Sequence, residues 1–194
     1  DRVYQINLAL AGIAVGTVSL PALSKAYKKK SILKISNIQN KSIELSLLLS
    51  IPASLGLVIA SSEIVNALFG YGSFKMQDVE MTSSALIFFG YGVIAFSLIK
   101  ILANFFFARD NTKTPFYISS FIVLLNLIIS VSFFNKVGFI IIPIATSLST
   151  WIGVFVYIYL LNKKKSLHLH NELFVNILKI TICTALMSLI LIFS

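Results

Sequence analysis

The chain has 194 residues, of which 57% are hydrophobic and only 12% are charged. A soluble domain carries about 25% charged residues, so the composition excludes an ordinary soluble domain and indicates a polytopic membrane protein. The net charge of +9 does not indicate a nucleic-acid partner. Most of the lysines lie in short segments between apolar runs, where the positive-inside rule accounts for them. The single cysteine, Cys183, leaves no disulfide framework or cysteine metal cluster to consider.

Apolar runs near the ~20 residues that cross a bilayer as a helix predict an all-α transmembrane helical bundle. Six spans are expected, at residues 3–23, 45–69, 81–107, 116–134, 139–161 and 174–193. The linkers 24–43, 108–115 and 162–173 carry eleven lysines and arginines, whereas the alternate linkers carry only Lys75 and Lys136. This asymmetry predicts that the three basic linkers are cytoplasmic.

The first span has a second interpretation, as a signal peptide with Arg2 at its charged start. Six lysines follow between residues 25 and 41, and such a block resists translocation. We therefore expect a retained helix whose carboxyl end is cytoplasmic. The chain opens without Met at a charged pair that reads as part of a helix already under way, so we expect a fragment of a longer chain.

The segment after the first span allows two interpretations. Ile32, Ile35 and Ile38 recur every three residues among lysines and polar groups. This spacing is typical of a short basic helix lying on the inner leaflet. A solvated loop whose lysines only set the topology fits equally well. Further along, Pro52 removes one helical hydrogen bond and predicts a bend in the second span.

Arg2 is the leading candidate for a binding residue. At helical spacing it shares one stripe with Gln5 and with small residues, namely Ala9, Gly12, Gly16 and Ser19. A charge on the small-residue face of a membrane helix is expected to face a protein interior or a wet cavity. Because adjacent helical residues point apart, Asp1 does not easily pair with Arg2, and the guanidinium stays free for a ligand.

Three further polar residues inside the spans are secondary candidates. Glu63 lies near the outer end of the second span, where an interfacial position also explains it. Lys100 lies seven residues before Phe107, roughly 10 Å from the inner end at 1.5 Å per residue. Snorkelling to the inner headgroups or pairing with another helix is favoured over a direct contact with a substrate. Asn126 lies near the middle of the fourth span, where a hydrogen bond to a neighbouring helix is favoured over a position lining a cavity.

Catalytic and metal-binding patterns are weak. Ser97 and Lys100 match S-x-x-K, a nucleophile motif of penicillin-binding enzymes, but S-D-N and K-T-G are missing and the nearest string is K-T-P at 113–115. His168 and His170, two histidines at i and i+2, do not make up a ligand set and are expected to be solvated loop residues. We therefore expect no enzyme, metal or cofactor, with a Ser–Lys membrane hydrolase as the alternative.

Several ordered strings resemble the MurJ (MviN) family of lipid II flippases. The family segment ADR…G-x-A…T-x-x-L-P-x-L-S-[RK] is matched by D-R at 1–2, G-I-A at 12–14, T at 17 and L-P-A-L-S-K at 20–25. Its L-F-x-x-G-x-F loop is matched by L-F at 68–69 with Gly72 and Phe74. Its K-V-L-A…F-Y-[AS]-R…[KR]-T-P stretch is similar to K-I-L-A at 100–103, F-F-A-R at 106–109 and K-T-P at 113–115. Asn7 and Asn104 stand at usual proline positions and Ala9 at a frequent glycine position, which puts local kinks in doubt.

The resemblance implies a fold like that of the multidrug/oligosaccharidyl-lipid/polysaccharide (MOP) exporter superfamily, with two six-helix lobes around a central cavity and two extra helices. Residues 1–161 would supply five helices of the second lobe, and residues 162–194 a basic loop and one extra helix. The missing first lobe would belong to the same longer chain.

The implied activity is translocation of lipid II from the inner to the outer leaflet of the bacterial cytoplasmic membrane. By this resemblance Arg2 contacts the pyrophosphate of the lipid-linked saccharide, with Asp1 beside it. The alternatives are a flippase for another lipid-linked oligosaccharide, a cation-coupled drug exporter of the same superfamily, and a scaffold subunit that transports nothing.

Overall fold

The computed structural model describes residue 5, residues 9–71 and residues 75–193. Within these residues the chain is helical and contains no strand, which confirms the all-α prediction. A short π-helix, η1 (Ala9–Ala14), leads into α2 (Val15–Lys28). The remaining elements are α3 (Ile32–Ile59), α4 (Ser61–Phe69), α5 (Met76–Phe107), α6 (Lys113–Val137), the 3₁₀ turn η2 (Gly138–Ile140), α7 (Ile141–Lys163) and α8 (Asn171–Phe193).

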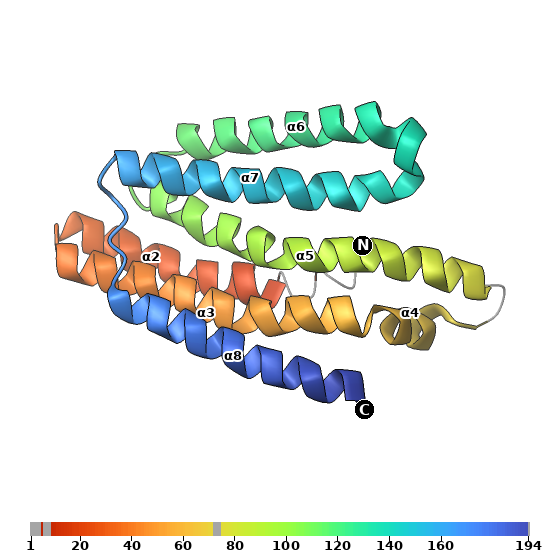
Figure 1. Cartoon of the computed structure of the whole chain (residues 1–194). Coiled ribbons are helices and arrows are strands. Elements are labelled where there is room, and N and C mark those ends of the chain that lie inside the picture. The colour runs from red at the N-terminus through yellow and green to blue at the C-terminus, as the bar shows by residue number, and fades with distance from the viewer. Residues whose placement is uncertain (1–4, 6–8, 72–74, 194) are drawn as a thin grey trace.

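Four described stretches are long and apolar enough to cross a membrane: Ile32–Ile59, Met76–Phe107, Lys113–Lys163 and Asn171–Leu191. The third of these holds both α6 and α7, which form a hairpin (Figure 1). Gly138 ends α6 and has a φ of 73°, a backbone conformation that residues with a Cβ atom rarely adopt. The turn that reverses the chain therefore depends on glycine at this position.

Helix α5 occupies the centre of the molecule (Figure 1). The α6–α7 hairpin covers one side of it, α2 and α3 cover the other, and α8 lies along α3. One end of the bundle is called the lysine-rich end below. Helices α2, α5 and α7 end there, and helices α3, α6 and α8 begin there. Helix α4 and the Gly138 turn lie at the opposite end.

Small residues allow α3 and α5 to pack closely. Ser54 Oγ on α3 donates a hydrogen bond of 2.8 Å to the carbonyl oxygen of Gly90 on α5. A Cβ atom at Gly90 would lie only 2.8 Å from Val58 Cγ2. The absence of a side chain at this position therefore sets the spacing of the two helices, as small residues generally do between membrane helices.

The core has two parts. The larger cluster lies toward the lysine-rich end and includes the fully buried Leu23, Phe105, Tyr157 and Leu161. The smaller cluster packs α4 against α3 and α5 toward the opposite end, through Leu57, Val65, Val79, Leu86 and Val93. Large apolar side chains on the outer faces of α6 and α8 stay exposed, for example Leu124, Ile128, Leu178 and Ile182. Such faces suit lipid contact.

The prediction for the segment after the first span was wrong in both versions. Residues from Ile32 onward form neither a separate helix on the leaflet nor a loop, because α3 runs without interruption from Ile32 through Pro52 to Ile59. Ile35 is only 6% exposed and belongs to the core. The helix is interrupted at Ala60 instead, so the predicted span 45–69 is divided between α3 and α4.

Candidate functional site

A cleft of about 370 Å³ lies between α2 and the α6–α7 hairpin, with α5 as its floor. Its lining mixes glycine and apolar residues with a few polar groups. The lining residues are Gly12, Ile13, Gly16, Thr17, Leu20, Ile99, Lys100, Ala103, Asn104, Phe107, Pro115, Ser119 and Tyr157. Pockets of about 300–1,000 Å³ with an apolar wall and a few convergent polar groups are the usual form of ligand sites.

Lys100 is the one charged side chain among the described residues that line the cleft. It is exposed, and the one ion pair within the described ranges is formed elsewhere, by Lys41 and Glu44. A strongly hydrated ammonium that can reach a cleft between membrane helices is suited to bind an anionic group such as a phosphate.

Asn104 and Gly16 join the floor of the cleft to its wall. Asn104 Nδ2 donates a hydrogen bond of 2.9 Å to the carbonyl oxygen of Gly16. A Cβ atom at Gly16 would lie 2.8 Å from the same nitrogen, so any larger residue would displace the amide from its present position. This bond fixes α2 on α5 at the position where the cleft opens, beside Lys100.

Of the other predicted site residues, those that the structure describes are not gathered at the cleft. Arg2 and Asp1 lie outside the described residues, and Gln5 is helical and exposed. Glu63 is exposed in the first turn of α4, toward the opposite end of the bundle.

Asn126 lies between α6 and α7 rather than in the cleft. Its Nδ2 donates a hydrogen bond of 2.9 Å to Thr146 Oγ1, and its Oδ1 accepts one of 3.1 Å from Ser130 Oγ. These contacts connect the two helices of the hairpin, as the packing interpretation of this amide predicted.

The Ser97–Lys100 pair does not have the geometry of a nucleophile and its base. Ser97 Oγ is fully buried and has no hydrogen-bond partner among the residues that the structure describes, whereas Lys100 is exposed and lines the cleft. A serine nucleophile needs a base within hydrogen-bond reach and an approach for the substrate. The structure therefore offers no support for a Ser–Lys hydrolase.

The solvated-loop prediction was wrong for His170, although His168 is exposed as predicted. His170 is half-buried, with Nε2 2.6 Å from Ser36 Oγ. Because that hydroxyl donates to the carbonyl oxygen of His168, the ring nitrogen of His170 acts as the donor. Asn40 Nδ2 also donates to the His168 carbonyl oxygen, at 2.6 Å. No group of three potential metal ligands of the His, Cys, Asp or Glu type occurs within the described ranges.

A cluster around Arg109 was missed by the sequence analysis. Arg109 Nη2 donates to Tyr27 Oη at 2.7 Å and to the Ser166 carbonyl oxygen at 3.0 Å, and its guanidinium stacks 4.7 Å from the centre of the Tyr27 ring. Gln39, fully buried, donates to the same carbonyl oxygen at 3.0 Å. The cluster attaches the linker between α7 and α8 to α2, to α3 and to the turn between α5 and α6. The only signal for it in the sequence is the position of Arg109 in the F-F-A-R string.

The fold and the cleft define a multi-pass helical membrane protein whose polar groups face a gap between helices. The sequence model of a protein family, described as lipid II flippase MurJ, matches residues 1–194 of this chain. The chain belongs to this family.

Individual relatives agree with this assignment. The chain is 35% identical over 191 residues to a probable lipid II flippase MurJ of Rickettsia prowazekii, covering 98% of this chain and 38% of the relative. It is 36% identical to the protein of the same description from Rhizobium tropici, covering 82% of this chain and 30% of the relative. A solved structure, lipid II flippase MurJ in the inward closed conformation, superimposes with a TM-score of 0.82 at 28% identity, covering 97% of this chain and 38% of that chain. The chain thus spans well under half the length of these relatives.

Proposed function

We propose that the chain forms part of the second lobe of a flippase that moves lipid II from the inner to the outer leaflet of the bacterial cytoplasmic membrane. One observation carries the proposal: 97% of the chain superimposes on a lipid II flippase with a TM-score of 0.82. The cleft adds support, because it offers an ammonium group, at Lys100, in a setting suited to an anionic headgroup.

The proposed mechanism is alternating access, in which two lobes rock around a fixed site. The pyrophosphate and sugars of lipid II cross through the polar interior while the polyprenyl tail stays in lipid. A charge held at mid-membrane costs roughly 2.5–3.5 kcal/mol on insertion scales, and an anionic ligand compensates for that cost. Lys100 supplies a point charge, and Arg2 supplies a planar fork that binds phosphate oxygens bidentately.

The proposed orientation has the lysine-rich end in the cytoplasm. This end holds the linkers within residues 24–43, 108–115 and 162–173, and cationic linkers are retained on the cytoplasmic side. The proposed activity is transport without covalent chemistry, and the burial of Ser97 Oγ argues against the hydrolase alternative.

The test of the proposed site is substitution of Arg2 in the intact protein, scored by growth of a bacterial strain depleted of its own lipid II flippase. Arg2→Ala is expected to abolish rescue while expression and membrane insertion persist, because the pyrophosphate loses its bidentate partner. Arg2→Lys is expected to restore growth only in part, since a point charge replaces the fork. Full rescue by both variants would remove Arg2 from the site and favour a scaffold role.

A further inference from the structure

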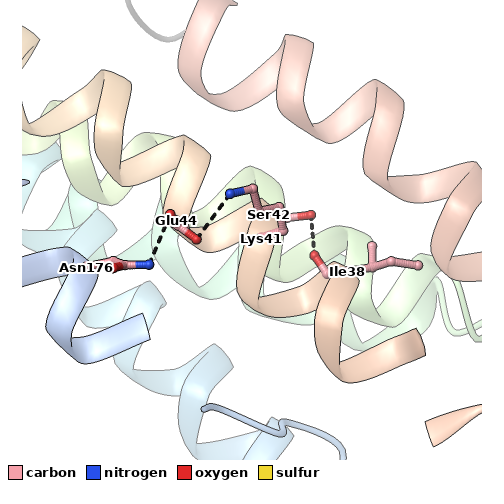
Figure 2. Close-up of polar contacts among 5 residues, drawn as sticks. All are labelled: Ile38, Lys41, Ser42, Glu44 and Asn176. Carbon is pink, nitrogen blue, oxygen red and sulfur yellow. Dashed lines mark hydrogen bonds and ion pairs between the residues drawn. The ribbon is translucent and has the colours of Figure 1, made fainter. Parts of the chain in front are cut away.

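A polar pocket of about 310 Å³ lies between α3 and the start of α8, near the lysine-rich end. Its lining residues are Asn37, Asn40, Lys41, Glu44, His170, Glu172, Leu173 and Asn176. Figure 2 shows the charged centre of this region: Glu44 lies between Lys41 on its own helix and Asn176 on α8. Lys41 Nζ is 3.6 Å from one Glu44 carboxylate oxygen, and Asn176 Nδ2 donates to the other at 3.3 Å.

An apolar groove of about 530 Å³ runs along the other side of Lys41, between α2 and α3. Its lining residues are Ala14, Val15, Val18, Ser19, Ala22, Ile38, Lys41, Ser42, Leu45 and Leu49. At 1.5 Å per residue the groove extends roughly 12 Å from Lys41 to Leu49. That is most of the ~15 Å of hydrocarbon in one leaflet. The groove therefore has the length and direction of an acyl chain that descends from the membrane surface.

Lys41 belongs to the lining of both cavities, so the polar pocket and the apolar groove adjoin at this residue. A polar end at the membrane surface joined to an apolar channel toward the membrane centre matches the shape of a phospholipid. We propose that the two cavities together bind one phospholipid with a primary ammonium headgroup, as in phosphatidylethanolamine, from the leaflet at the lysine-rich end.

The charges of the pocket favour this headgroup over an anionic one. In the proposed complex Lys41, which lines the pocket and the groove, contacts the phosphate, and Glu44 and Glu172 in the pocket offer two carboxylates to the ammonium. These three side chains together carry one net negative charge, which opposes phosphatidylglycerol. Amide and carboxylate oxygens also accept hydrogen bonds from a primary ammonium, whereas the quaternary ammonium of phosphatidylcholine has no N–H to donate.

The headgroup has to provide the selectivity. Lipid tails are as apolar as the side chains of the groove, so chain burial alone does not distinguish one lipid from another. The groove positions the chain, and the pocket selects the lipid. The inference is independent of the proposed cargo, because it uses neither Arg2 nor the cleft around Lys100.

The test is native mass spectrometry of the delipidated, detergent-solubilised intact protein, titrated in turn with phosphatidylethanolamine, phosphatidylglycerol, phosphatidylcholine and a polyprenyl phosphate. The wild type is expected to retain one phosphatidylethanolamine at least fivefold more than each other lipid. Lys41→Met is expected to lower this adduct at least threefold, and Leu45→Trp to lower it for every lipid by filling the groove. Glu44→Gln is expected to narrow the preference over phosphatidylglycerol, because it removes one of the two carboxylates and the net negative charge. Lys34→Met, the same change on an exposed lysine of α3 that lines neither cavity, is the matched control.

Equal retention of the four lipids, or a preference for the polyprenyl phosphate, would overturn the proposal. So would an adduct that Lys41→Met and Lys34→Met lower equally. Photocrosslinking of the wild type gives a second test that does not depend on how the variants fold. Phosphatidylethanolamine with a photoreactive group in its acyl chain is expected to crosslink to α2 and α3 along the groove. Crosslinks confined to the outer faces of α6 and α8 would contradict it.

Discussion

At the scale of single residues, Asn104 and Gly16 are the pair that shapes the cleft. In the sequence Asn104 is noticeable only because it stands where the family usually has proline. The structure gives this position a role that proline lacks, since the amide donates to the Gly16 carbonyl oxygen. Which glycine it meets could not be predicted, because the two residues are 88 positions apart in the sequence.

A double-mutant cycle tests this pair. Asn104→Ala removes the hydrogen bond and is expected to destabilise the protein by about 0.6 kcal/mol, the average for side-chain hydrogen bonds between membrane helices. Gly16→Ala places a Cβ 2.8 Å from Asn104 Nδ2 and displaces the amide. The double variant is expected to be less destabilised than the sum of the single variants, because the shortened side chain on α5 no longer meets the methyl group added on α2.

The measurement is reversible unfolding of the intact protein in detergent. Gly56→Ala is the matched control, since a Cβ at Gly56 meets nothing within 4 Å and alanine favours a helix. Strictly additive losses for Gly16 and Asn104 would show that the two residues do not interact.

At the scale of helices and linkers, hydropathy could predict most of the elements but not how the linkers are held. The spans expected at 81–107, 116–134, 139–161 and 174–193 correspond to α5, α6, α7 and α8 with shifts of a few residues. The errors fall where polar residues have distant partners: Ser36 contacts His170 across 134 positions. Local periodicity does not contain this information, and so the start of α3 and the histidine loop were misinterpreted.

Arg109 is expected to hold the linker between α7 and α8 in place. Arg109→Ala removes the hydrogen bonds to Tyr27 and Ser166, and bonds from a charged donor are worth about 1.5–3 kcal/mol each. Gln39 keeps its own bond to Ser166, so the linker is expected to loosen without unfolding α8. Backbone amides of residues 164–170 should exchange roughly tenfold faster, the factor that corresponds to about 1.4 kcal/mol.

Hydrogen exchange followed by mass spectrometry measures this effect, with Lys113→Ala as the matched control because Lys113 is an exposed cation close to Arg109 in the sequence. Equal exchange in the two variants would mean that the linker is held without Arg109.

At the scale of the whole molecule, the described part of the chain is a layered helical assembly with a cleft beside Lys100 and a lysine-rich end. The hairpin of α6 and α7, the central α5 and the pair α2–α3 form successive layers, and α8 is added on the outside of α3 (Figure 1). Composition alone could predict a helical membrane bundle. The family resemblance was needed to expect a transporter lobe, because the chain holds no complete catalytic motif and its cleft residues are scattered over η1, α2, α5, α6 and α7.

The most direct test of the central claim is lipid II translocation by the intact protein in proteoliposomes, with lipid II detected as it becomes accessible in the opposite leaflet. The wild type is expected to translocate lipid II, and Lys100→Met to reduce the rate at least tenfold, because the cleft loses its ammonium group. Lys136→Met, which removes an exposed lysine far from the cleft, should retain the wild-type rate. Translocation of another lipid-linked oligosaccharide with none of lipid II, or equal rates for the two lysine variants, would contradict the account.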